Sequence, residues 1–382
     1  MRTTHQNLPR QNSLRVLHVV SGDLWAGAEV QVYQLLRAAC RQPGISLRAV
    51  VLNPGMLAER LAGEGVSVTV LDESALGFRA LAGSIRAIAR DYRPAVVHTH
   101  RRKEHLLGAL AARACGAGLV ATVHGRDEVQ HARRNIRQAA LRFTEQALLA
   151  YVHHRLIAAS DELARELPGA GNRTVVIPNS VDVAAVREAA STGSVSVPDG
   201  KRIIHVGFLG RLVPVKQVDH ILGMLHLLET EQPGRWVLHI VGDGPLRTAL
   251  RDLTAALKLE RQVTFHGFQP NPLPLLARMD LLLLASAHEG LPMTALEALS
   301  LGVPIVSPPI GSLERLITEA GAGAVARSSE PSDLAEAALA LELRPRGKAA
   351  LRPSLLPDRY RIENGVERTL ALWREVSSGR GN

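Results

Sequence analysis

The sequence predicts an α/β protein built from two doubly wound parallel sheets. Short β-branched runs alternate with amphipathic helical segments, a pattern typical of βαβ units. The alternation stops between residues 184 and 200, where Ser, Thr, Gly and Pro are frequent, and then starts again. A chain of 382 residues is also long enough for two domains.

The order of strands and helices follows from this alternation. In the first helical segment, for example, Val32, Leu35, Leu36 and Ala39 recur at the spacing of one helix face. The strands expected in the first half are residues 15–20, 47–52, 66–71, 95–98, 119–123, 155–158 and 174–177. Those expected in the second half are residues 202–206, 236–241, 262–265, 281–285 and 303–306.

These patterns divide the chain into five expected segments. They are a flexible polar tail (1–13), a first domain (14–183), a linker (184–200), a second domain (201–356) and a C-terminal helix (357–382). The tail has no apolar segment typical of a secretion signal. In the C-terminal helix, Ile362, Val366, Leu370 and Trp373 lie at helical spacing.

Composition excludes several classes of protein. Aromatic residues are only 3%, too few for the stacking platforms of a single-strand nucleic-acid binder, so no nucleic-acid partner is expected. No run of about 18 apolar residues is long enough to span a membrane. Cys40 and Cys115 lie far apart in apolar helical contexts and fit buried thiols of a reducing compartment, so a cytoplasmic location is expected.

The net charge of +9 is concentrated in the first half. Residues 1–190 hold 24 Arg and Lys against 16 Asp and Glu, whereas the remainder holds 21 against 20. Basic clusters lie at residues 101–103 and in the series Arg133, Arg134, Arg137 and Arg142. One interpretation is attraction to an anionic membrane surface, at its inner face, or to a phosphate-bearing acceptor. The other is an Arg-rich composition on a solvated face.

The most informative segment for chemistry is residues 287–299. It follows an apolar strand, and Pro292 suits the first turn of a helix, which places Glu289 on the preceding loop and Glu297 inside the helix. The free amides of Gly290, Met293 and Thr294 would then form an anion site at the positive end of this helix. Two carboxylates at these places can reach different hydroxyls of one ligand. The alternative is a helix that merely has acidic residues near its start.

A second segment, residues 206–216, leaves another strand and carries two cations. Arg211 offers a bidentate fork and Lys216 a point charge, a combination that suits a diphosphate. A solvated basic loop is the alternative, although Lys216 is one of only five lysines. The glycines there do not form the triplet of a dinucleotide fold, and the chain has no Walker-type loop, which disfavours hydride transfer and ATP hydrolysis.

Other candidates lie at further strand ends. Gly242 belongs to a Gly/Pro turn that follows the strand 236–241, and a plain tight turn explains it as well as ligand contact does. Gly27 permits close backbone approach at the start of the first helix, where a simple turn is the alternative. His124 precedes a glycine and is the best catalytic candidate among the histidines that end successive strands.

The sequence offers no convincing metal site. His98, His100 and His124 have no Cys spacing or further carboxylate that supports zinc. No Asp-x-Asp pair occurs to bind a divalent cation that bridges a diphosphate. We therefore expect neither a metal nor another cofactor.

Taken together, these motifs resemble the retaining glycosyltransferases of the GT-B fold, family 4. The similarity runs from Val16 to about Ile317, in the family's order across both halves. Its pieces are Gly27-Ala28-Glu29, Val97-His98-Thr99-His100, Thr122-Val123-His124-Gly125, Ile177-Pro178-Asn179, Gly210-Arg211 with Lys216, Val241-Gly242-Asp243-Gly244-Pro245, and Glu289 to Glu297 in the Glu-x7-Glu motif.

The resemblance implies two Rossmann-like domains that face a cleft, and a nucleotide-diphosphate sugar bound mainly by the second domain. Arg211 and Lys216 would hold the diphosphate, Glu297 the ribose and Glu289 the donor sugar. Amides of Gly27 and of residues 290–294 would complete the shell, and His124 would lie beside the sugar. The terminal helix would cross back to the first domain.

The implied reaction is metal-independent transfer with retention of configuration, by front-face attack in which the leaving phosphate helps to deprotonate the acceptor. A UDP-sugar is the favoured donor and a GDP-sugar the next. The acceptor would be a glycan or lipid-linked molecule of cell-envelope, exopolysaccharide or lipopolysaccharide synthesis. The alternatives are a glycosidase, a non-catalytic scaffold that binds sugar nucleotides or lipids, and a nucleotide-sugar epimerase of the same fold.

Overall fold

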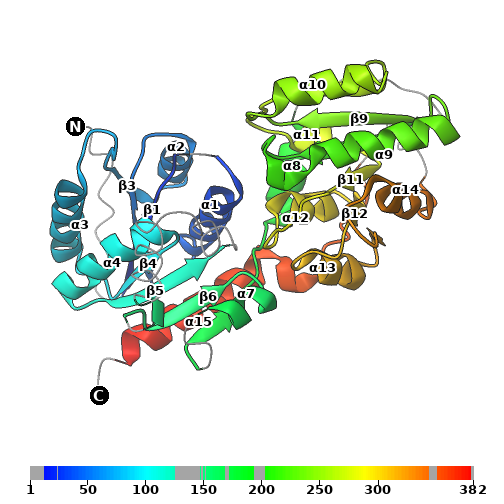
Figure 1. Ribbon diagram of the computed structural model, residues 1–382. Coiled ribbons are helices and arrows are strands. Elements are labelled where there is room, and N and C mark those ends of the chain that lie inside the picture. Colours follow the sequence, from blue (N-terminus) through cyan, green and yellow to red (C-terminus); the bar gives the residue numbers. More distant parts are fainter. Residues whose placement is uncertain are drawn as a thin grey trace. The chain divides into compact units, whose positions relative to one another are not determined.

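The computed structural model describes residues 13–23, 25–124, 147, 149–150, 152–167, 172–192, 203–343 and 351–379. The chain divides into two compact units. One comprises Met1–Ser180 with Ile362–Asn382, and the other comprises Val181–Arg361. Each unit contains its own parallel sheet, covered by helices (Figure 1).

The sheet of the first unit has the strand order β3-β2-β1-β4-β5-β6-β7, and all neighbours pair in parallel. Its strands are β1 (Leu14–Val20), β2 (Ile45–Val51), β3 (Ser67–Val70), β4 (Val96–Thr99), β5 (Gly118–Val123), β6 (Arg155–Ala158) and β7 (Thr174–Val176). Its helices are α1 (Gly27–Ala39), α2 (Met56–Gly63), α3 (Phe78–Tyr92), α4 (Arg102–Cys115), α7 (Asp161–Glu166) and α15 (Ile362–Ser378).

The sheet of the second unit repeats this plan in the order β10-β9-β8-β11-β12-β13, again with parallel pairs. Its strands are β8 (Ile204–Leu209), β9 (Trp236–Val241), β10 (Val263–Gly267), β11 (Leu281–Leu283), β12 (Ile305–Ser307) and β13 (Gly323–Val325). Its helices are α8 (Val183–Ser191), α9 (Val218–Glu231), α10 (Arg247–Ala256), α11 (Leu273–Leu276), α12 (Met293–Ser300), α13 (Leu313–Ala320) and α14 (Pro331–Leu339), with short 3₁₀ turns η1 (Pro214–Lys216) and η2 (Asp358–Tyr360).

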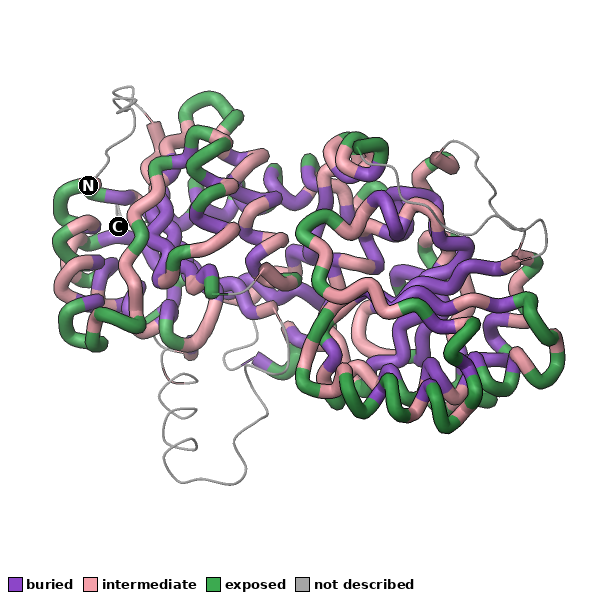
Figure 2. The backbone as a smooth tube through the Cα atoms, turned by 90° about the horizontal axis from the view of Figure 1, so that it is seen from above, coloured by how far each residue is buried: buried purple, intermediate pink, exposed green. Residues whose placement is uncertain are grey.

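Alternating side chains explain why each sheet needs helices on both faces. In β1, Val16 packs with α1, α2 and α15, whereas its neighbour Leu17 packs with α3 and α4. In the second unit, β8, β9 and β11 share a core with α9, α10 and α14. Buried residues therefore follow the strands, and exposed ones follow the outer sides of the helices (Figure 2).

The predicted α/β class and strand order of two parallel sheets are confirmed. Every expected strand is present, with ends that differ by three residues or fewer. Strand β13 was not predicted, because its Gly-Ala-Val sequence is short and half-buried and gives no apolar run. Cys40 and Cys115 are free but only half-buried, where fully buried thiols were expected.

The linker predicted over 184–200 is wrong at its start, because α8 occupies Val183–Ser191. Asp182 caps this helix by accepting a hydrogen bond from the Ala185 amide at 2.9 Å. Val186 and Ala190 are buried on one side of it. The small alanines of this segment made its helical pattern weak in the sequence.

The C-terminal helix α15 packs in the first unit, against α1 and the ends of β4 and β5. Its apolar stripe ends at Trp373, which is fully buried. The Trp373 indole N–H donates to Nδ1 of His98 at 3.3 Å. This helix therefore completes a core that is built mainly by the start of the chain.

We expect Trp373→Phe to lower the free energy of unfolding by about 1–2 kcal/mol, because it leaves a small cavity and an unpaired nitrogen on buried His98. Urea unfolding measures this loss. The matched control is Trp236→Phe, which removes an indole bond to half-exposed Gln232 that water can replace. Equal losses in the two variants would contradict this explanation.

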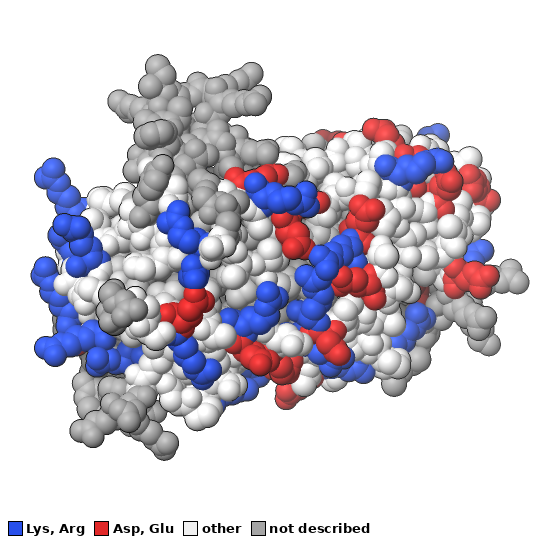
Figure 3. Space-filling model, turned by 90° about the horizontal axis from the view of Figure 1, so that it is seen from below, with Lys and Arg blue, Asp and Glu red and all other residues white. Residues whose placement is uncertain are grey.

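Neither basic cluster supports the expectation of an open basic surface. At residues 101–103, Arg101 pairs with Asp23 and Glu29, and Lys103 pairs with Glu73. The series from Arg133 to Arg142 lies outside the described residues. On the face shown in Figure 3, acidic side chains lie next to many basic ones. No helix of the described part is long and apolar enough to cross a membrane.

Candidate active site

The candidate site of the second unit lies where the sheet reverses its winding direction. Strands β8 and β11 are neighbours, and the chain moves outward from them in opposite directions, to β9 and to β12. In doubly wound sheets, ligands bind at the carboxyl ends of such strands. There, β8 continues into the turn that carries Arg211 and Lys216, and β11 into the loop that carries Glu289.

Local backbone structure places Lys216 at this point. It is the last residue of η1, and its amide donates to Val213 O at 3.0 Å. Gln217 follows with φ 46°, the left-handed turn that starts α9. The Ala287 amide donates to Val215 O at 2.8 Å and so ties the loop after β11 to η1. This bond joins the two motifs that the sequence separates by about seventy residues.

The central contact is an ion pair between Lys216 Nζ and Glu289 Oε1. Ser286, fully buried at the end of β11, donates its hydroxyl to the same oxygen at 2.8 Å. The two charged side chains keep 21% and 14% of their surface exposed, so a ligand can reach both. Within the described part of the chain, Glu289 Oε2 has no hydrogen-bond partner.

Close backbone approaches support both sides of this ion pair. A Cβ at Gly242, which has φ +134°, would lie 1.9 Å from Gly210 O, so these two turns can pack only with glycine there. A Cβ at Gly210 would lie 3.8 Å from Lys216 Cε. On the other side, a Cβ at Gly311 would lie 2.2 Å from Glu289 O. Gly242 thus serves loop packing, the tight-turn alternative of the sequence.

Helix α12 begins at Met293, so Pro292 is its N-cap rather than part of its first turn, as expected from the sequence. The amides of Met293 and Thr294 have no carbonyl to bond within the helix and are available to an anion. The amide of Gly290 precedes them, and its carbonyl accepts from the Ser312 amide at 3.3 Å. The predicted positive helix end therefore follows Glu289 directly.

Glu297 lies one turn into α12, and burial raises the pKa of its carboxyl to about 7. No described residue forms an ion pair with it or hydrogen-bonds to its side chain. A carboxylate without partners is costly to bury, so its place is explained by a ligand that donates hydrogen bonds to it. Arg211 is exposed and likewise has no acidic partner in the described part of the chain.

The first unit has its own reversal point, between β1 and β4. The loop after β1 leads to Gly27, the exposed first residue of α1, whose amide is free by helix geometry. His124 follows β5 directly and is half-buried. The sequence therefore places Gly27 and His124 correctly at the carboxyl edge of this sheet.

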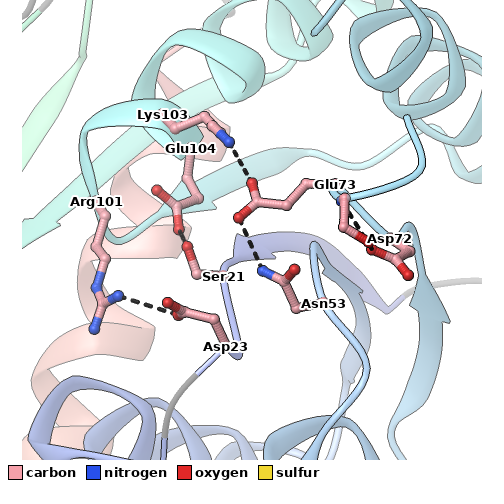
Figure 4. A network of polar contacts seen from close by, with 9 residues as sticks. Ser21, Asp23, Asn53, Asp72, Glu73, Arg101, Lys103 and Glu104 are labelled. Carbon is pink, nitrogen blue, oxygen red and sulfur yellow. Dashed lines mark hydrogen bonds and ion pairs between the residues drawn. The ribbon is translucent and has the colours of Figure 1, made fainter. Parts of the chain in front are cut away.

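A polar network covers the same edge (Figure 4). Glu73, which follows β3, pairs with Lys103 and accepts from the Asn53 amide at 3.1 Å. Glu104 accepts a hydrogen bond from Ser21. Burial raises the pKa of Glu104, and its second oxygen has no partner among the described residues. The edge thus combines hydroxyl, amide and charged groups, which suit a polar ligand.

Three histidines of this unit lie close enough to suggest a metal site. Ring nitrogens of His18, His98 and His100 lie within 4.8 Å of one another, and all three rings are buried. The Trp373 indole is a donor only, so His98 Nδ1 must accept its hydrogen bond. His98 Nε2 then carries the proton and donates to Thr122 at 2.8 Å. His98 has no lone pair left for a metal, so this group does not fit a three-histidine site.

Some residues of the site were missed by sequence reasoning. Ser286 gives no signal because a serine at a strand end is common. Gly311 follows a strand, and its positive φ of 52° is visible only in three dimensions. His18 is separated from His100 by 82 residues, and only the pairing of β1 with β4 brings them together.

Two family models match the chain, one in each half. Residues 25–185 match "Glycosyltransferase Family 4", and residues 195–353 match "Glycosyl transferases group 1". Together they cover most of the sequence and meet the sites of both units. The chain therefore belongs to the glycosyltransferases of group 1 and family 4, and it is a glycosyltransferase.

Relatives and solved structures agree with this class. The 2-deoxystreptamine N-acetyl-D-glucosaminyltransferase of Streptomyces fradiae is 28% identical over 336 residues, 76% of each chain. The D-inositol 3-phosphate glycosyltransferase of Actinosynnema mirum is 27% identical over 85% of this chain and 82% of its own. Crystal structures of Anabaena HepE with UDP and with UDP-glucose have a TM-score of 0.75 at 19% identity, over 94% of this chain and 99–100% of theirs. These structures confirm the GT-B fold.

Proposed function

We propose that this glycosyltransferase moves a sugar from a UDP-sugar to a hydroxyl of a glycan or lipid-linked acceptor in cell-envelope or secreted polysaccharide synthesis, with retention of configuration. The observation that carries the proposal is the Lys216–Glu289 ion pair at the reversal point of the second sheet, next to the start of α12. Opposite charges, free helix amides and a buried carboxylate lie there in the order that a nucleotide sugar requires.

Each end of the donor has a matching group in this arrangement. Lys216 and Arg211 would bind the diphosphate and stabilise the charge that develops on it as the glycosidic bond breaks. Lys216 must leave Glu289 to do so, and the freed carboxylate can then accept hydrogen bonds from sugar hydroxyls. Amides of Gly290, Met293 and Thr294 add phosphate contacts. Glu297 is the candidate partner of the two ribose hydroxyls.

Groups of the first unit complete the proposed donor shell. Gly27 offers a free amide at the start of α1, and His124 ends β5 with a ring that burial keeps neutral, its pKa being lowered to about 4. We assign His124 to the donor sugar rather than to the diphosphate, because a neutral imidazole suits hydroxyls better than phosphate. The leaving phosphate, not a protein carboxylate, would take the acceptor proton.

UDP is the favoured nucleotide because HepE, which shares the fold, has been solved with UDP and with UDP-glucose. We expect UDP-glucose or UDP-N-acetylglucosamine to raise thermal stability by about 2.7 kcal/mol at a concentration of 100 times Kd. GDP-mannose is the comparison donor. With two cations in place of a bridging metal, transfer should proceed equally in EDTA and in magnesium.

Product analysis tests the reaction itself. Incubation of the stabilising donor with glycan, lipid-linked and small cyclitol acceptors should release UDP only when an acceptor is present. The cyclitols are included because the names of two relatives give such acceptors. Release of free sugar without acceptor, or interconversion of the donor, would contradict transfer. Stabilisation by GDP-sugars alone would overturn the choice of nucleotide.

A further inference from the structure

Three histidines of the first unit form a chain of ring-to-ring hydrogen bonds that ends at His124. His124 Nε2 lies 3.3 Å from Nδ1 of His100, and His100 Nε2 lies 3.2 Å from Nδ1 of His18. Neighbouring rings are nearly parallel, with interplanar angles of 22° and 17°. The chain runs from the end of β5, past β4, to the middle of β1. His124 is thus connected to residues that no ligand can touch.

All three rings are neutral. Burial lowers the pKa of His18 and of His100 well below the usual value, and each also repels charge on its neighbours. Burial, and next the charge of Arg101, lower the pKa of His124 to about 4. A neutral imidazole has one N–H and one lone pair. The two bonds can therefore form only if all three protons point the same way along the chain.

The two ends of the chain decide between the two directions. One end must expose an N–H that no ring accepts: either Nε2 of His18 or Nδ1 of His124. His18 is fully buried, and its Nε2 has no partner among the described residues. His124 is half-buried at the sheet edge, and the Asn179 side chain acts on its ring as a hydrogen-bond acceptor, which raises the pKa. An unpaired buried N–H is rarely tolerated, so the proton belongs at the His124 end.

We propose that His18 and His100 are positioning residues that hold His124 as the tautomer with its proton on Nδ1, so that His124 donates a hydrogen bond to substrate oxygens and cannot act as a general base. His18 Nδ1–H donates to His100, and His100 Nδ1–H donates to His124 Nε2. This inference rests on the proposed function, which places His124 beside the donor sugar. It adds that the ring contributes a donor fixed from behind, as orienting partners of catalytic histidines do.

The tautomer can be observed directly in the full-length protein. With ¹⁵N-labelled histidine, two-bond ¹H–¹⁵N correlations distinguish a proton on Nδ1 from one on Nε2. The signals of His124 are those lost in His124→Gln. We expect Nδ1–H for His124 in the unaltered protein. A proton on Nε2 would overturn the proposal whatever the activity, and this measurement needs no variant of the buried chain to fold.

Variants of His18 test the connection. His18→Leu removes the donor at the start of the chain, so His124 should populate both tautomers and kcat should fall about tenfold, with donor KM little changed. His18→Asn places an amide N–H near the position of Nδ1 and should restore both the tautomer and the rate. An unchanged tautomer or an unchanged rate in His18→Leu would contradict a positioning role.

The second unit offers a matched control. His205, His239 and His266 form a similar chain across β8, β9 and β10, with ring nitrogens 3.0 Å apart at both steps. His239→Leu removes an equally buried histidine from this chain and should leave the His124 tautomer and kcat unchanged. If His124→Ala itself keeps full activity, the proposed role of His124 fails, while the tautomer measurement still decides whether the chain orients it.

Discussion

Replacement of Lys216 by alanine is expected to lower kcat by about 10²–10³-fold, the range for loss of one charged group that stabilises a developing negative charge. Lys216 is the one cation of the candidate site that the structure ties to a glutamate and to the loop of the neighbouring strand. Its charge matters most when the bond to the diphosphate breaks, so kcat should fall more than donor affinity. Steady-state kinetics with the donor and acceptor found above measure both.

The result has to be separated from damage to the fold. Lys216 and Glu289 are both partly exposed, and Ser286 still holds the carboxylate after the lysine is removed, so thermal stability should change little. Lys216→Arg keeps the charge and should recover part of the rate. The control is Lys258→Ala, which removes an exposed lysine from the turn before β10. Parent-like turnover in Lys216→Ala would remove the diphosphate role from this residue.

The sequence predicted the fold well because its signals were local. Strands such as β1 and β9 are runs of apolar and β-branched residues, and turns with Gly or Pro separate them from helices. The failures had equally local causes. Strand β13 is too short and too small to show a pattern, and α8 is masked by its alanines beside a linker. No local signal gives the order in which parallel strands pair.

The site was predicted only as far as side-chain chemistry is written in the motifs. Lys216 and Glu289 carry charges that suit a diphosphate sugar, and the structure brings them into contact. Their contact depends on the backbone bond from Ala287 to Val215, and Glu289 is held by Ser286, for which the sequence gives no sign. The histidine chain depends on parallel register between β1 and β4, in which His18 lies beside His98. Such contacts arise from tertiary packing.

Glu297 should show a conflict between stability and donor binding. Its carboxyl has a pKa of about 7 in the folded protein against 4.5 in an unfolded chain, because burial disfavours the charge. Between these values the folded state keeps a proton that the unfolded state has lost, so stability falls as pH rises from about 4.5 to 7 and is level above that range. Glu297→Gln removes this penalty. We expect it to stabilise the protein by at most about 3 kcal/mol at pH 8 and by nothing at pH 4.

The same variant should bind the donor less well. Hydrogen bonds from ribose hydroxyls to a charged carboxylate exceed those to an amide, so donor KM should rise about 10-fold or more at pH 8. In the parent enzyme, donor KM should rise as pH falls below 7, because protonated Glu297 loses its charge. Glu260→Gln, on an exposed turn, is the control for both measurements. A stabilised Glu297→Gln with parent-like donor KM would keep the burial argument and refute the ribose contact, whereas a raised KM without stabilisation would do the reverse.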